Sequence, residues 1–160
     1  MVHQEGVRAE SPGERQIMHH AHNRAARRLQ PLANQGEDLL LVKPQGFMNT
    51  SGGPLKKVCQ AYSATADDVI VIHDELDIDP GTIRVKFGGG HAGHNGLRSI
   101  CDKLGTRDWS RVRCGIGRPP GRMPVADYVL SLPKKDAADD FAQATDLGCE
   151  AALFLIEHGL

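Results

Sequence analysis

Asp74 is the acidic residue of this 160-residue chain whose neighbours in sequence best suit a role in general-base catalysis. It lies in the string His73-Asp74-Glu75, directly after an apolar run. An aspartate at the end of a strand can hold a histidine in its useful tautomer and stabilise the imidazolium. Asp74 is therefore a candidate for the group that orients a catalytic base. The alternative is that Asp74 only caps the turn toward Pro80.

Two asparagines could hold a substrate or a water molecule. Asn49 follows Phe47 and Met48 and precedes a Ser-Gly-Gly turn, and its amide could donate to a developing oxyanion. A cap at the entry of the next helix is the alternative for Asn49. Asn95 begins a predicted helix after a glycine-rich stretch, where capping is the interpretation that needs no function.

The stretch 88–96 holds five glycines together with His91 and His94. Such a loop lets backbone N–H groups approach a phosphate. Because Gly96 is followed by Leu97 and not by Lys and Ser or Thr, the stretch is no nucleotide-hydrolysing P-loop. Zinc ligands usually sit on regular elements with supporting hydrogen bonds, so we expect these histidines to bind no metal.

Positive charge is concentrated in one part of a nearly neutral chain. Residues 82–122 carry nine Lys or Arg against two Asp, or +7, so the remainder carries −8 of the overall −1. Such a block can be the footprint of a polyanion, and a solvated surface with incidental charge is the alternative. The nine are Arg84, Lys86, Arg98, Lys103, Arg107, Arg111, Arg113, Arg118 and Arg122.

The composition indicates one globular domain with an aliphatic core, since 40% of residues are hydrophobic and only 4% are aromatic. No apolar run reaches membrane-spanning length, and the first residues lack a secretory signal. The four cysteines are scattered without a CxxC pair, which indicates reduced thiols. We therefore expect a cytoplasmic protein.

The elements that must position these residues alternate along the chain. The sequence predicts strands at 38–42, 69–72, 82–87 and 111–116, the first two buried on both faces. In the third, the alternation predicts three apolar residues facing inward and two basic residues facing outward. Helices are predicted from Pro54, after Gly96 and over 136–158, the last with a buried stripe that includes Phe141. This order predicts an α/β sandwich with a mixed sheet.

Four strings, in order and spacing, resemble the bacterial peptidyl-tRNA hydrolases. The resemblance covers residues 37–160 and leaves out 1–36. The strings are Lys43-Pro44-Gln45-Gly46-Phe47-Met48-Asn49-Thr50-Ser51-Gly52, His73-Asp74-Glu75-Leu76-Asp77, the run from Phe87 to Ser99, and Arg113-Cys114-Gly115-Ile116-Gly117-Arg118-Pro119.

The resemblance implies a single α/β domain with a mixed, mostly parallel sheet flanked by helices. It also implies hydrolysis of the ester between peptide and tRNA, without a metal or organic cofactor, by a monomer. Asp74 resembles the aspartate that orients the histidine base, whereas Asn49 and Asn95 resemble the asparagines that position substrate and water. Phe47 lies in the same wall, and the three polar residues are expected to converge on one pocket. The glycine loop and the basic block then resemble the surface for the tRNA acceptor stem and 3′ end.

Residues 1–36 depart from the family pattern. Family members begin with a strand, a Gly-Asn-Pro-Gly turn and a Thr-Arg-His-Asn string that holds the catalytic histidine. Here only Ser11-Pro12-Gly13 and His22-Asn23 echo these motifs, so His22 is an imperfect candidate for the base. We expect 1–36 to be an irregular, truncated or frame-shifted segment, with the first family strand absent and catalysis impaired. A tRNA-binding protein of the same fold without catalysis is the alternative.

Overall fold

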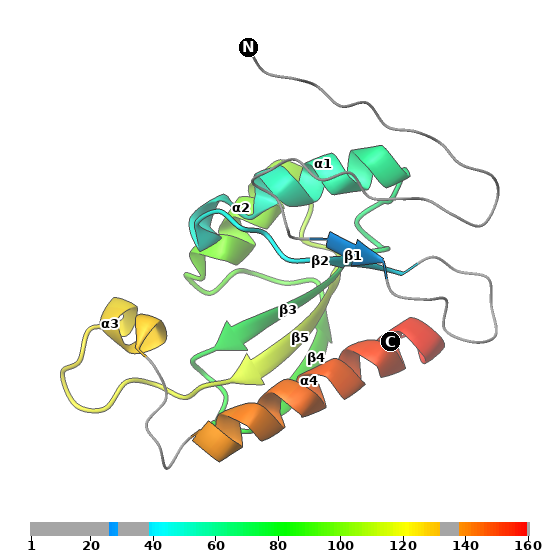
Figure 1. The fold of residues 1–160 in the computed structure, drawn as a ribbon. Coiled ribbons are helices and arrows are strands. Elements are labelled where there is room, and N and C mark those ends of the chain that lie inside the picture. Colours follow the sequence, from blue (N-terminus) through cyan, green and yellow to red (C-terminus); the bar gives the residue numbers. More distant parts are fainter. Residues whose placement is uncertain (1–25, 29–38, 132–137, 160) are drawn as a thin grey trace. The chain divides into compact units, whose positions relative to one another are not determined.

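The computed structural model describes residues 26–28, 39–131 and 138–159 (Figure 1). The chain divides into two compact units. Unit 1 comprises residues 1–58 and 93–103, and unit 2 comprises residues 59–92 and 104–160. The candidate base His22 lies outside the described residues, as does Asp136, where the last helix was predicted to begin.

Unit 1 holds two short strands and most of two helices. Strands β1 (Ala26–Arg28) and β2 (Leu40–Val42) pair antiparallel. A 3-10 turn, η1 (Met48–Thr50), leads into α1 (Gly52–Tyr62), and α2 (Asn95–Leu104) follows the glycine-rich loop. Of the four apolar residues of α2 predicted to face the core, Leu97, Ile100 and Cys101 are buried and Leu104 is half-buried.

The start of α1 lies against α2 because residue 52 has no side chain. The backbone N–H of Gly52 donates to Ser99 Oγ at 3.0 Å. A Cβ at Gly52 would overlap the backbone carbonyl of Ser99, and it would lie 2.9 Å from the backbone nitrogen of Ile100. Only glycine therefore permits this approach of the two helices.

Unit 2 contains a three-stranded mixed sheet in the order β3-β5-β4. Strand β3 (Ile70–Glu75) runs parallel to the central β5 (Ser110–Gly115), whereas β4 (Ile83–Phe87) runs antiparallel to it. A short helix, α3 (Val125–Leu130), and the long α4 (Ala138–His158) follow the sheet in sequence.

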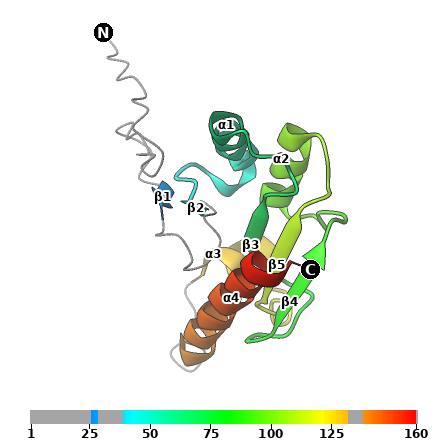
Figure 2. The ribbon, with the colours of Figure 1, turned by 90° about the vertical axis from the view of Figure 1, so that its right-hand side faces the viewer.

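The core of unit 2 lies between the sheet and α4, which runs along β5 and its neighbours (Figures 1 and 2). Gly148 of α4 lies over Cys114 of β5, where a Cβ would approach the Cys114 Sγ to 3.1 Å. Val112 on the same face of β5 is fully buried. The buried residues of α4 are Ala144, Gly148 and Leu155, as the helical spacing predicts.

The opposite face of this sheet is basic. The register pairs His73 with Arg113, and Arg113 with Arg84. One step along, Arg111 pairs with Lys86. Because side chains alternate along a strand, these residues share one face. Arg84 and Lys86 are exposed there, which confirms the predicted basic outer face of β4.

The predicted α/β class with a mixed sheet flanked by helices is confirmed. Within the described residues, however, only β3 and β5 pair parallel, and the other two strand pairs are antiparallel. The predicted strands and helices are present with boundaries shifted by a few residues, and α3 was not predicted. Its sequence, which starts after Pro124, is only six residues long and too short for a helical period.

Two predictions for the first strands are wrong. Ala26–Arg28 forms β1, within the segment 1–36 that was expected to be irregular. The prediction of a strand buried on both faces at 38–42 is wrong at Leu41, which is 48% exposed in β2. A three-residue strand in a two-stranded ladder has too little neighbouring chain to bury both of its faces.

The prediction that every inward apolar residue is buried also fails at the edges of unit 2. Val85 and Phe87 are exposed on β4, and Ile72 is exposed on β3. Both strands are edges of the sheet, and α4 packs mainly on β5 between them. Phe141 is exposed as well, because it lies in the first turns of α4.

Among the described residues, no helix is both long and apolar enough to cross a membrane.

Substitution of Gly52 tests the packing of α1 on α2. We expect Gly52→Ala to lower the free energy of unfolding by about 1–3 kcal/mol, because the added methyl group forces the two backbones apart. Denaturant titration followed by circular dichroism measures this change. Gly53→Ala is the matched control, since a Cβ there meets nothing within 4 Å and alanine is the better helix former. Equal stability of the two variants would contradict the predicted overlap.

Candidate active site

Asn49 lies in η1 with its side chain available to a ligand. Thr50 donates to the Phe47 carbonyl through its backbone N–H (2.9 Å) and its hydroxyl (2.8 Å), which closes the turn. The hydroxyl of Ser51 donates to the Met48 carbonyl in the same way. Asn49 is exposed and its amide forms no hydrogen bond within the described residues. The alternative role of Asn49 as a helix-entry cap is therefore not seen.

Phe47 precedes this turn in an extended conformation, with φ −64° and ψ 142°. Its side chain is 83% exposed, which is unusual for a phenylalanine. The ring thus stands beside Asn49 as an uncovered apolar surface.

His94, and not Asn95, caps α2. The backbone N–H of Leu97 donates to His94 Nδ1 at 3.2 Å, and the N–H of Arg98 donates to the His94 carbonyl at 3.0 Å. This is the bonding pattern of an N-cap residue, with the ring nitrogen in place of the usual side-chain oxygen. The capping alternative for Asn95 is therefore wrong. Its side chain is exposed and forms no hydrogen bond with the described residues.

A second glycine brings the two asparagines to the same end of unit 1. Gly96 is buried, and a Cβ there would lie 2.9 Å from both Met48 Cγ and His94 Cε1. Met48 of η1 therefore contacts the first turn of α2. Asn49 follows Met48 and Asn95 precedes Gly96, so the backbones of the two asparagines lie next to this contact, and both side chains are exposed.

Asp74 belongs to unit 2, on β3, where it pairs in register with Cys114 of β5. It is half-buried, and its carbonyl lies 2.7 Å from Nδ1 of the buried His73. Burial raises the pKa of the Cys114 thiol, and Cys149 and Asp74 add smaller contributions in the same direction. Cys114 consequently stays neutral at physiological pH and adds no charge beside the Asp74 carboxylate.

The next residue, Glu75, is engaged in an ion pair. Arg113 donates to Glu75 Oε2 through Nε at 3.1 Å and through a terminal nitrogen at 3.0 Å, and both side chains are largely buried. This ion pair holds the Glu75 carboxylate against the neighbouring strand β5.

Arg111 holds the glycine loop in place. Its two terminal nitrogens donate to the carbonyls of Gly90 (2.7 Å) and Gly89 (2.6 Å), and its guanidinium lies 4.0 Å from the ring centroid of Trp109. Gly88 and Gly89 both have positive φ, at 63° and 98°, which only glycine adopts easily. Arg111 therefore orients this loop from within the protein.

The basic block is only partly available to a polyanion. Arg111 is buried, Arg113 is paired with Glu75, and Arg118 donates to Asp77 at 2.7 Å. The other six are exposed, namely Arg84, Lys86, Arg98, Lys103, Arg107 and Arg122. Charge counted along the sequence thus overestimates the charge that can meet phosphates.

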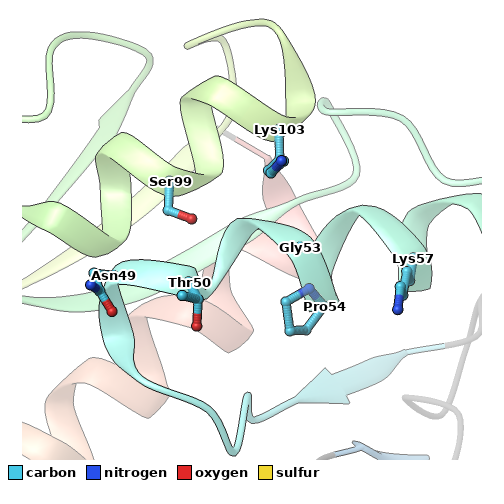
Figure 3. Close-up of a pocket in the computed structure, with 7 residues that line it drawn as sticks. All are labelled: Asn49, Thr50, Gly53, Pro54, Lys57, Ser99 and Lys103. Atoms are coloured by element: carbon cyan, nitrogen blue, oxygen red, sulfur yellow. The ribbon is translucent and has the colours of Figure 1, made fainter.

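An open pocket of about 460 Å³ lies in unit 1 beside Asn49 (Figure 3). Residues from η1, α1 and α2 line it, namely Asn49, Thr50, Gly53, Pro54, Lys57, Ser99 and Lys103. Neither lysine was predicted as a site residue in its own right. The helical spacing of Gly53 with Lys57, and of Ser99 with Lys103, was the signal that could have identified them.

Comparison with known proteins gives the family. The model of the family described as peptidyl-tRNA hydrolase matches residues 9–160. The chain belongs to the peptidyl-tRNA hydrolase family. The match begins within the segment 1–36 that the motif comparison left outside the resemblance.

Its relatives include peptidyl-tRNA hydrolases of several actinobacteria. The chain is 49% identical over 128 residues to that of Rhodococcus erythropolis (73% of this chain and 67% of the relative). It is 48% identical over 125 residues to that of Mycobacteroides abscessus (78% of this chain and 64% of the relative). For Streptomyces coelicolor the identity is 44% over 133 residues (83% and 66%). The chain thus spans about two thirds of the length of these relatives.

Solved structures of the family have the same fold. A crystal structure of a peptidyl-tRNA hydrolase in complex with N-propanol matches with a TM-score of 0.72 and 33% identity, covering 81% of this chain and 64% of that chain. The peptidyl-tRNA hydrolase of Acinetobacter baumannii matches with a TM-score of 0.69 and 34% identity, covering 76% and 62%. These matches confirm the predicted single-domain, peptidyl-tRNA hydrolase-like α/β fold.

Replacement of His94 tests its role as the cap of α2. We expect His94→Ala to lower the free energy of unfolding by about 1 kcal/mol, because the Leu97 N–H loses its acceptor. We expect His94→Asn to keep most of the stability, since asparagine is among the best N-cap residues. Thermal and denaturant unfolding of both variants measures the difference. Equal losses in the two variants would show that packing, and not capping, is the contribution of His94.

Replacement of Arg111 tests its control of the glycine loop. In Arg111→Lys one ammonium group must replace the two terminal nitrogens that bond Gly89 and Gly90 separately. We expect amide hydrogen exchange in residues 88–92 to become at least tenfold faster, with a smaller change in α4. Unchanged exchange in the loop would contradict this role.

Proposed function

We propose that this chain hydrolyses the ester bond between the peptide and the tRNA of peptidyl-tRNA. Membership of the family and the shared fold support this activity. The single observation that carries the assignment of the site is the pair of exposed, unengaged amides of Asn49 and Asn95, fixed at one end of unit 1 by the contact of Met48 with Gly96.

In the proposed reaction, the two asparagines hold the substrate ester and the attacking water. An amide N–H of either residue can donate to the carbonyl oxygen, which becomes an oxyanion when water adds to the carbonyl carbon. The exposed ring of Phe47 supplies an apolar surface for the same substrate. Collapse of the tetrahedral intermediate then breaks the bond to the 3′-terminal ribose oxygen, which leaves with a proton.

A histidine base takes the proton from water, and Asp74 is proposed as the carboxylate that orients this base. Asp74 suits the role because it is half-buried on a strand, next to a thiol that burial keeps neutral. His22 is the imperfect candidate for this base, because residues 1–36 otherwise lack the family's Thr-Arg-His-Asn string, and no cofactor is proposed.

The proposed substrate surface comprises the glycine loop and the six exposed basic residues of the block. Phosphate contacts of this kind supply affinity for the acceptor stem and 3′ end without reading base sequence. We propose that the protein acts in the cytoplasm as a monomer, as a member of a family that serves translation.

Turnover of peptidyl-tRNA by the full chain tests the proposed activity. We expect release of the peptide from an N-blocked aminoacyl-tRNA, and a loss of roughly 10²–10⁴-fold in kcat for both His22→Ala and Asp74→Asn, since each removes general-base catalysis. The KM should change little, because neither residue supplies affinity for tRNA.

The control for this experiment is Glu75→Gln, which makes the same acid-to-amide change one residue away from Asp74. Binding of tRNA without any ester cleavage by the unchanged chain would instead favour a non-enzymatic tRNA-binding protein. Turnover that persists in His22→Ala but falls in Asp74→Asn would assign the base to another histidine.

A further inference from the structure

The pocket beside Asn49 combines two lysines with no acidic residue. Its lining contains Lys57 from α1 and Lys103 from α2, and none of the seven residues carries a carboxylate. Neither ammonium group forms an ion pair with a carboxylate of the described residues. By contrast, Arg113 and Arg118 of the basic block are paired.

The two lysines line the same pocket from two different helices. Gly53 and Lys57 are four residues apart on α1, as Ser99 and Lys103 are on α2, so each pair lies on one helix face. In Figure 3, Ser99 and Lys103 point from α2 toward α1. The hydrogen bond from the Gly52 N–H to Ser99 Oγ fixes this arrangement at one end of the pocket.

The two hydroxyl groups of the pocket differ in their ability to donate a hydrogen bond to a ligand. Thr50 uses its hydrogen to bond the Phe47 carbonyl. Ser99 Oγ accepts the Gly52 N–H, and its own hydrogen is donated to no acceptor among the described residues. Ser99 can therefore donate one hydrogen bond to a ligand in the pocket that Lys57 and Lys103 also line. Two cations and one O–H donor, with no competing acid, are the complement of a phosphate group.

We propose that this pocket is a phosphate subsite, in which Lys57, Lys103 and Ser99 hold one phosphodiester of the nucleic-acid substrate. This inference rests on the proposed function and adds a binding site for the sugar-phosphate backbone of the tRNA next to Asn49. A phosphodiester anchored here would lead the 3′ end past the exposed asparagine. Affinity from this contact is independent of base sequence and depends on salt.

The test is the salt dependence of tRNA binding by the full chain. We expect Lys57→Met and Lys103→Met each to weaken the binding of deacylated tRNA about three- to tenfold at low salt. Each should also reduce the slope of log Kd against log salt concentration by about 1, the signature of one lost cation–phosphate contact. In the double variant this slope should fall by about 2.

The matched control is Lys56→Met. Lys56 is exposed on the same helix, next to Lys57 in sequence, and does not line the pocket. The Lys56→Met substitution should leave the slope within about 0.3 of the slope for the unchanged chain. Circular dichroism of each variant checks that the fold persists, and since Lys56 and Lys57 are both exposed, we expect no change.

The outcomes separate this proposal from the proposed function. Equal slopes for Lys57→Met and Lys56→Met, with tRNA still bound and hydrolysed, would overturn the subsite alone. Absence of tRNA binding by the unchanged chain would overturn both proposals. If inorganic phosphate stabilises the unchanged chain but not the double variant, while their slopes for tRNA are equal, the pocket binds free phosphate and the assignment to nucleic acid fails.

Discussion

The close approach of backbone at Gly52 and Gly96 is the constraint on which unit 1 depends. At both positions a Cβ would overlap or crowd a neighbour, in one case the backbone of α2 and in the other the side chains of Met48 and His94. Since the two glycines sit at the starts of α1 and α2, they fix where both helices begin. The exposed amides of Asn49 and Asn95 and the lysine pocket all follow from this arrangement.

The sheet of unit 2 places its charges by a different principle. Alternation along β3, β5 and β4 sends apolar residues toward α4 and a row of basic residues and a histidine to the opposite face. Two of the basic residues serve the protein itself, since Arg111 bonds the glycine loop and Arg113 pairs with Glu75. The two hydrogen bonds from the buried Arg111 offset part of the cost of its desolvation, so this arginine serves the structure of the loop.

The elements with strong periodicity could be predicted from the sequence. The buried residues of α2, the basic outer face of β4 and the mixed sheet follow from spacing alone. Exposure of Ile72, Val85 and Phe87 could not be predicted, because it depends on which strands are edges and on where α4 packs. The cap of α2 was missed for a different reason: His94 is an unusual N-cap residue, and asparagine at the next position is the common one. The family could be predicted from four motifs. The structural roles of Arg111 and Arg113 could not be predicted, because they depend on which groups these side chains contact in the folded protein.

The central claim is that Asn49 and Asn95 hold one and the same substrate. A double-mutant cycle on the kcat/KM for peptidyl-tRNA, with Asn49→Ala, Asn95→Ala and the double variant, measures it most directly. The account predicts a loss of about 10²-fold or more in each single variant, and a double variant far less impaired than the product of the two losses, because residues that act as a unit are not additive. Strictly multiplicative losses, or a single variant with unchanged kcat/KM, would contradict it.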